Sequence, residues 1–213
     1  QTYTVYANNS GGSATTTIDI TVNDVIPSLI TYSSSAFVET RDSAMTTGTP
    51  SVSGGPVVTW SIAPALPTGL DIDTSTGEIS GTPTVNSPLT TYTVTATNSG
   101  GSATTTLDIT VNDIIPSSVT YVGSPYVETK DSAMSTGIPT YNGGTVLTWS
   151  VSPTLPTGLN IDASTGEISG TPTVLSTSTT YTITATNTGG SATTTIEITV
   201  NDIIPTISYS PNS

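Results

Sequence analysis

The chain contains no cysteine and no histidine. Without cysteine it can form neither disulfide bonds nor thiolate metal sites, although this absence alone indicates no particular compartment. Without histidine, the common zinc sites and the Ser–His and Cys–His catalytic pairs are excluded. The chemistry left to the chain is that of carboxylates, hydroxyls and amides.

Positive charge is almost as scarce. Arg41 and Lys130 are the 2 basic residues of the chain, against 15 acidic ones, and the net charge is −13. Such a chain has nothing with which to neutralise phosphates, so we expect no nucleic-acid partner. The same shortage argues against binding to anionic membrane surfaces.

Long hydrophobic runs are also missing. No stretch approaches the roughly 20 apolar residues of a membrane span, so we expect no membrane insertion in this segment. Hydrophobic residues make up 33% of the chain, and the polar remainder is dominated by Thr, Ser, Asn and Gly. Threonine favours strands while Gly, Pro, Asn and Ser favour turns, which predicts an all-β protein.

The sequence repeats itself. Gly-Gly-Ser-Ala-Thr-Thr-Thr begins at Gly11, Gly100 and Gly189, and the offset of 89 residues (100 − 11, 189 − 100) recurs between Trp60 and Trp149. A constant offset means that no residues are inserted between these positions, so we expect structurally equivalent units.

Each unit is taken to end at a Val-Asn-Asp sequence. This predicts residues 1–24 as the C-terminal hairpin of a preceding repeat, 25–113 and 114–202 as complete repeats, and 203–213 as the start of a following repeat. The two end pieces supply 35 of 89 positions (24 + 11), too few to complete a repeat. We therefore expect the sequence to come from a longer chain.

Hydrophobic residues alternate strictly in two places near the end of each repeat. Tyr92, Val94 and Ala96 alternate with threonine, and within 103–111 Leu107, Ile109 and Val111 alternate with polar residues. This period of two predicts a hairpin closed by Asn98-Ser-Gly-Gly, with Trp60 as a core aromatic. Further strands are expected at about 28–32, 36–40, 57–62, 69–73 and 78–81, roughly seven in each small sandwich.

One longer motif is repeated almost unchanged. Residues 66–83 read Leu-Pro-Thr-Gly-Leu-Asp-Ile-Asp-Thr-Ser-Thr-Gly-Glu-Ile-Ser-Gly-Thr-Pro, and residues 155–172 match them closely. Both resemble the signature of the immunoglobulin-like repeats of bacterial and archaeal surface proteins, relatives of the cadherin-like domain of dystroglycan. The resemblance implies tandem Ig-like or cadherin-like β-sandwiches at the cell surface or outside the cell. Such repeats occur in adhesins, filaments, surface layers and the spacers of hydrolases, so it does not specify a function.

The residues of this motif can also be explained by their role in folding. Asp73 can cap a turn by accepting backbone N–H bonds, and Gly77 can adopt a left-handed conformation. Pro83 ends the strand because it has no N–H to donate.

Calcium is the cofactor that the acidic residues could support. Val111-Asn-Asp-Ile-Ile-Pro116 looks like the cadherin linker pattern, and Asp71-Ile-Asp73 resembles its Asp-x-Asp. Calcium needs six to eight oxygen ligands at one place. The alternative is that these side chains cap turns or lie on solvated edges. The candidate ligands are Glu39, Asp71, Asp73, Asn112 and Asp113, and in the second repeat Glu128, Asp162, Asn201 and Asp202.

Catalysis is not expected. A glycosidase-like carboxylate pair is formally available, but its members recur in every repeat, and a duplicated active site in adjacent repeats would be unusual. The short linker, with its proline and isoleucine pair, favours a stiff joint and a rod of repeats. We expect the shaft or stalk of a surface fibre or large adhesin, with neighbouring repeats and like chains as partners. The alternatives are an adhesive module that binds a glycan or a like chain, and spacer repeats in a secreted hydrolase.

Overall fold

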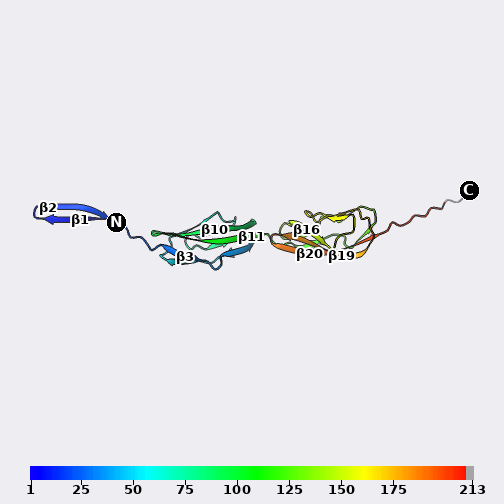
Figure 1. Ribbon diagram of the computed structural model, residues 1–213, viewed down its shortest axis with the longest axis horizontal. Helices are drawn as coiled ribbons and strands as arrows, with labels where there is room; N and C mark the ends of the chain where they lie inside the picture. The colour runs from blue at the N-terminus through cyan, green and yellow to red at the C-terminus, as the bar shows by residue number, and fades with distance from the viewer. Residues whose placement is uncertain (210–213) are drawn as a thin grey trace. The chain divides into compact units, whose positions relative to one another are not determined.

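A computed structural model describes residues 1–209, and every regular element in that range is a β-strand (Figure 1). The predicted all-β fold is confirmed. Within residues 1–209 there is no helix long and apolar enough to cross a membrane. Residues 203–209 carry no strand, and the remainder of the predicted repeat start at 203–213 lies outside the described residues.

The chain divides into two compact units. One holds Gln1–Glu39 with Ser43–Thr110, and the other holds Thr40–Asp42 with the chain from Val111 onward. The first unit begins with a hairpin of β1 (Thr2–Asn9) and β2 (Gly12–Asp19), paired antiparallel from Thr2↔Asp19 to Asn9↔Gly12. Every residue of these two strands is exposed, so the hairpin has no buried face.

Nine strands follow in the first repeat, and nine in the second. The first set is β3 (Pro27–Thr31), β4 (Ala36–Thr40), β5 (Met45–Thr46), β6 (Ser51–Gly54), β7 (Thr59–Ala63), β8 (Leu70–Ile72), β9 (Ile79–Gly81), β10 (Ser87–Asn98) and β11 (Gly101–Asn112). The second set is β12 (Ser117–Thr120), β13 (Tyr126–Thr129), β14 (Met134–Ser135), β15 (Thr140–Asn142), β16 (Thr148–Ser152), β17 (Leu159–Ile161), β18 (Ile168–Gly170), β19 (Ser176–Asn187) and β20 (Gly190–Asn201).

The sequence pattern did not predict β5, β6 and their counterparts β14 and β15. β5 and β14 are two residues long, too short for an alternation to be visible. β6 reads Ser-Val-Ser-Gly and carries Val52 as its one apolar residue, which is itself only half-buried. The strands that bury several residues were all predicted.

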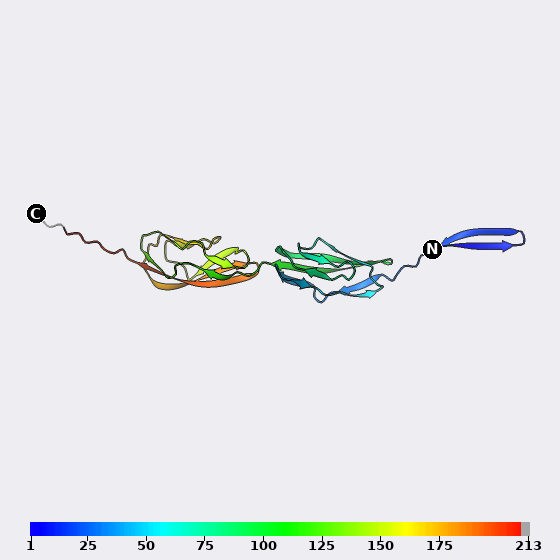
Figure 2. The same cartoon turned by 180° about the vertical axis from the view of Figure 1, so that it is seen from behind.

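Both repeats have the same sheet topology, seen from the opposite side in Figure 2. A four-stranded sheet has the order β4-β11-β10-β7 in the first repeat and β13-β20-β19-β16 in the second. Facing it are a two-stranded sheet, β3-β6 or β12-β15, and a three-stranded sheet, β5-β9-β8 or β14-β18-β17. In the second repeat β13, an edge strand of the four-stranded sheet, runs parallel to the last strand, β20, from Tyr126↔Ile198 to Thr129↔Asn201.

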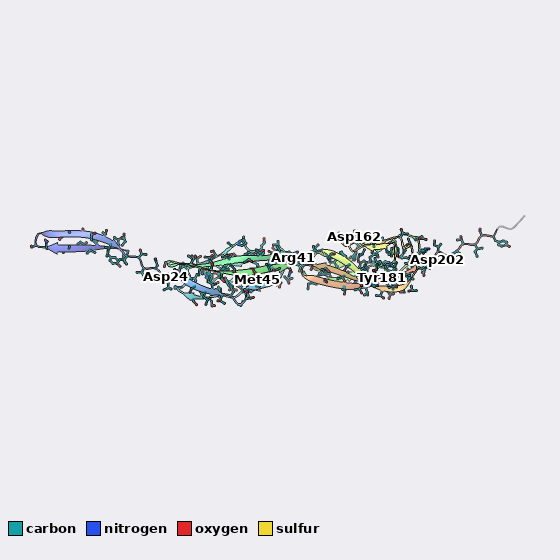
Figure 3. All side chains as sticks on the ribbon, in the orientation of Figure 1. Asp24, Arg41, Met45, Asp162, Tyr181 and Asp202 are labelled. Atoms are coloured by element: carbon teal, nitrogen blue, oxygen red, sulfur yellow. The ribbon has the colours of Figure 1, made fainter. Side chains whose placement is uncertain are left out.

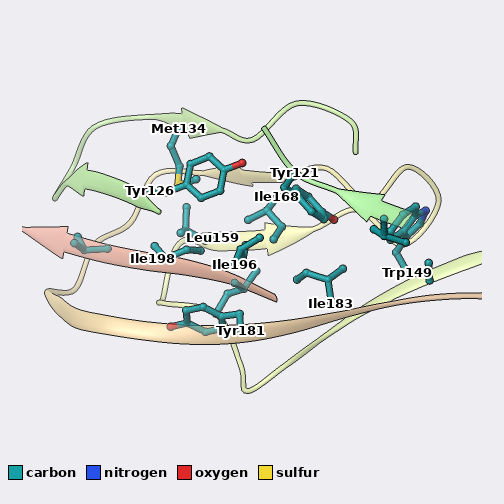
Figure 4. Close-up of a cluster of buried hydrophobic side chains, with 14 of the residues drawn as sticks. Tyr121, Tyr126, Met134, Trp149, Leu159, Ile168, Tyr181, Ile183, Ile196 and Ile198 are labelled. Carbon is teal, nitrogen blue, oxygen red and sulfur yellow. The ribbon is translucent and has the colours of Figure 1, made fainter. Parts of the chain in front are cut away.

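The core lies between these layers. In the second repeat Trp149, Ile168, Ile183 and Ile198 are 0–3% exposed and pack together (Figure 4). Trp60, at 4% exposure, occupies the same place in the first repeat, so its predicted core role is confirmed. Each such side chain contributes about 1.5–3 kcal/mol on burial, so the alternating strands supply the largest stabilising term of each repeat.

Candidate functional site

The signature loop after β8 is organised by Asp73. One oxygen of its carboxylate, Oδ1, accepts the backbone N–H groups of Ser75 and Thr76 at 2.7 and 3.0 Å. These backbone hydrogen bonds hold the pKa of Asp73 below its usual value. Asp162 makes the same two bonds to Ser164 and Thr165, with the same effect on its pKa. The predicted turn-capping role of Asp73 is therefore visible in both repeats.

Gly77, at the end of the same loop, lies against the Trp60 indole. Its φ is +78°, in the left-handed region that was predicted for it. A Cβ at this position would come within 2.6 Å of the Trp60 ring. The Gly77 carbonyl accepts the Tyr32 hydroxyl at 2.6 Å, and burial raises the pKa of Tyr32 to about 12, so this hydroxyl remains a donor at neutral pH. The loop is thereby fixed to the core.

The acidic side chains predicted as calcium ligands do not form a cluster of three or more among residues 1–209. Within residues 1–209 no three acidic side chains lie close enough together to hold a metal ion. Asp71 and Asp73 border one shallow hollow, but the first contacts the backbone N–H of Ile72 and the second caps the loop. Of the remaining candidates, Asp113 is buried, Asp162, Asn201 and Asp202 are exposed, and Glu39, Asn112 and Glu128 are half-buried. Figure 3 labels Asp162 and Asp202. Calcium binding stays a prediction.

Among residues 1–209, Asp113 is the one acidic side chain that is buried, with 5% of its side chain exposed. Its backbone N–H donates to the Thr188 hydroxyl at 2.9 Å, and its Oδ1 accepts the Ile114 N–H at 2.8 Å. Gly144 and Gly189 flank it, and a Cβ on either would overlap its carboxylate or its carbonyl oxygen. The linker socket is defined as Asp113, Ile114, Gly144, Thr188 and Gly189.

Arg41 supplies the charge that balances Asp113. Its guanidinium nitrogen Nη2 lies 3.0 Å from Asp113 Oδ1, and its backbone N–H donates to the Asn112 carbonyl at 2.8 Å. The Nε atom of Arg41 also lies 3.3 Å from Asp42. The guanidinium therefore bridges two carboxylates, one buried and one exposed.

The equivalent aspartate 89 residues earlier (113 − 24), Asp24, has a similar setting without an arginine. Its N–H donates to the Ser99 hydroxyl at 2.9 Å, and that hydroxyl donates to Asp24 Oδ2 at 2.7 Å. Asn98 fixes the next residue by donating to the Val25 carbonyl at 2.7 Å, as Asn187 does to Ile114. The Asn-Ser/Thr-Gly-Gly turn is therefore a receptor for the linker as well as the closure of a hairpin.

Sequence reasoning found Asp113 but missed Arg41, Thr188 and Gly144 as its partners. Arg41 lies 72 residues before Asp113 (113 − 41), and no local pattern connects them. One signal was present: the chain's two basic residues, Arg41 and Lys130, stand 89 positions apart, at the same place in the repeat.

Comparisons with known proteins agree with this architecture. A family model described as "Putative Ig domain" matches residues 26–112 and 113–201. The serine-rich adhesin for platelets of Staphylococcus aureus MRSA252 is 37% identical over 149 residues, which are 68% of this chain and 11% of the adhesin. In strain MSSA476 the adhesin is also 37% identical, and the match covers 6% of it, so the chain spans about a tenth or less of these relatives.

Solved structures show the same fold at low sequence identity. The titin I-band fragment I67–I69 aligns with a TM-score of 0.51 and 16% identity, covering 94% of this chain and 74% of the fragment. Extracellular domains 3–5 of Drosophila OTK align with a TM-score of 0.50 and 16% identity, covering 94% and 70% of the two chains. With two tandem matches to the family model over most of its length, the chain belongs to the family described as "Putative Ig domain".

Proposed function

We propose that this chain is a load-bearing segment of a surface adhesin or fibre, and that its role is structural and not catalytic. The observation that carries the proposal is the pairing of β13 with β20. In chain order β13 is the first strand of the four-stranded sheet and β20 is the last strand of the repeat. The two strands are neighbours in that sheet and run parallel.

Parallel pairing of such strands determines how force acts on the repeat. When the two ends of a repeat are pulled apart, β13 and β20 are drawn in opposite directions along their length. All the ladder bonds between them are then loaded together in shear, instead of opening one after another. The backbone bond from Lys130 N to the Asn201 carbonyl, at 2.8 Å, extends this ladder by one residue.

The kinship with a staphylococcal adhesin supports a position at the cell surface. In that setting two equal repeats would act as spacers between a binding region and the cell. The composition fits such a role, since the chain is rich in threonine and serine and only 8% of its residues are charged.

Single-molecule force spectroscopy on the chain tests the proposal. Both repeats should unfold with equal gains in length, about 300 Å each for 89 residues at roughly 3.6 Å per residue. Lys130→Pro, which removes the donor to Asn201, should lower the unfolding force of the second repeat. Thr173→Pro is the matched control, because it removes a bond of similar length, 2.9 Å, to Thr157 outside the β13–β20 pair.

Two results would count against a load-bearing role. One is an equal fall in unfolding force for Lys130→Pro and Thr173→Pro, because then β13–β20 would not be the element that resists the force. The other is saturable binding of this chain to a particular glycan on an array, which would identify the repeats as the adhesive modules.

A further inference from the structure

The buried position of Asp113 raises the question of what neutralises it. A carboxylate with 5% of its side chain exposed has lost most of its hydration, which is costly unless a positive charge or several donors compensate. In a cadherin-like linker pattern that positive charge would be a metal ion. Here the acidic side chains do not cluster in threes anywhere in residues 1–209.

We propose that the guanidinium of Arg41 is the cation of this linker, taking the place of a metal ion at Asp113. Arg41 Nη2 contacts Asp113 Oδ1 at 3.0 Å, the same oxygen that accepts the Ile114 N–H at 2.8 Å. Because both bonds converge on Oδ1, this oxygen is already engaged by the protein's own donors. The inference concerns the chemistry of the linker and does not depend on the load-bearing role.

The Arg41–Asp113 pair also differs from the other ion pairs. Among residues 1–209 the three ion pairs are Arg41–Asp42, Arg41–Asp113 and Lys130–Asp131, and only the Arg41–Asp113 pair involves a buried carboxylate.

Lys130 provides a matched control within the chain. It occupies the repeat position of Arg41, and its N–H makes the corresponding bond to the Asn201 carbonyl. Its ammonium group, however, lies 3.9 Å from the exposed Asp131 and not beside a buried carboxylate. Removing the charge of Lys130 therefore breaks only an exposed pair, whose contribution is small.

The test is thermal unfolding of the chain followed by Trp149 fluorescence in a Trp60→Phe background. The otherwise wild-type chain is compared with Arg41→Gln, Lys130→Gln, Asp113→Asn and Arg41→Gln/Asp113→Asn. Arg41→Gln leaves Asp113 buried and unpaired, so its Tm should fall by on the order of 10 °C. Lys130→Gln should leave Tm almost unchanged. The double variant should melt above Arg41→Gln, because it removes the unpaired charge. Wild-type Tm should be the same in calcium and in EDTA.

Three outcomes would overturn the proposal. Arg41→Gln could melt no lower than Lys130→Gln, the double variant could melt as low as Arg41→Gln, or calcium could raise the Tm of the wild type. If Arg41→Gln does not fold at all, the double variant shows whether the unpaired charge of Asp113 is the cause. A folded double variant supports a charge-balancing arginine, and an unfolded one contradicts it.

Discussion

At the scale of a single residue, the backbone conformation at position 77 and the packing around it both require glycine. Its φ of +78° disfavours any side chain, and the indole of Trp60 occupies the space that a Cβ would need. Gly166 and Trp149 repeat this arrangement in the second unit, with a φ of +79°. The glycine of the signature is therefore required by packing and backbone conformation, which explains its presence without any ligand.

Because of Asp73 and Asp162, the free energy of unfolding of the chain should fall as the pH is lowered into the acidic range. The backbone hydrogen bonds to each carboxylate lower its pKa in the folded state. Their stabilising effect is fully present above the unfolded pKa of about 3.9, and it is lost as the pH falls through the lower folded value. Replacing both by asparagine keeps an oxygen acceptor but removes the titration. We expect the free energy of unfolding of this double variant, measured by chemical denaturation, to change less between about pH 5 and 2 than that of wild type.

A second double variant serves as the control for this effect. Glu78→Gln/Glu167→Gln removes two carboxylates from the same loops, whose side chains contact the hydroxyls of Thr46 and Ser135 and not backbone N–H groups. If it flattened the pH profile as much as the aspartate variant did, the loss at acidic pH would not come from the Asp73 and Asp162 caps.

At the scale of elements, one heptapeptide occurs in two environments. Gly-Gly-Ser-Ala-Thr-Thr-Thr begins at Gly11 in the exposed hairpin, and at Gly100 and Gly189 in the packed sheets. An isolated two-stranded hairpin is marginally stable in water, whereas strands of a folded core open only with the whole domain. Amides of β2 should therefore exchange about several thousandfold faster than those of β11 and β20, as a domain stability of about 5 kcal/mol implies.

Hydrogen exchange read by mass spectrometry checks this directly, because identical sequence removes differences in intrinsic exchange rate. Tyr3 and Ile18 lie in the hairpin at 44% and 46% exposure, while the core-facing residues Tyr92 and Leu107 of β10 and β11 are 2% exposed. Slow exchange of β2, similar to that of β11, would show that the hairpin has a buried face in solution.

These elements also show what a sequence can predict. The strand pairs β10–β11 and β19–β20 were predicted because each strand buries three or more alternating residues, and Asp73 was predicted as a cap because its partners are two and three positions away. β5 and β6 were missed because their short segments acquire strand geometry from their partners β9 and β3, and not from their own pattern. The pairing of Arg41 with Asp113 depends on the fold alone, since neither residue has a local signal for the other.

At the scale of the whole molecule, two separate cores determine how the chain should unfold. One cluster surrounds Trp60 and the other surrounds Trp149, and no residue belongs to both. Because each repeat contains a single tryptophan, fluorescence in a Trp60→Phe or Trp149→Phe background reports one repeat at a time. Distant substitutions that share no partners usually have additive effects, so damage to one core should be confined to its own repeat.

Ile198→Ala tests that independence. Ile198 is fully buried in the second core, and truncating such a side chain costs about 2–5 kcal/mol. For a repeat of this size each kcal/mol lowers Tm by about 4–8 °C, so the Trp149 transition should fall by about 10 °C or more. The Trp60 transition should not move. Ile109→Ala, at the equivalent buried position of the first repeat, should give the reverse result. A common shift of both transitions in either variant would mean that the two repeats unfold as one cooperative unit, so that a disturbance in one core reaches the other.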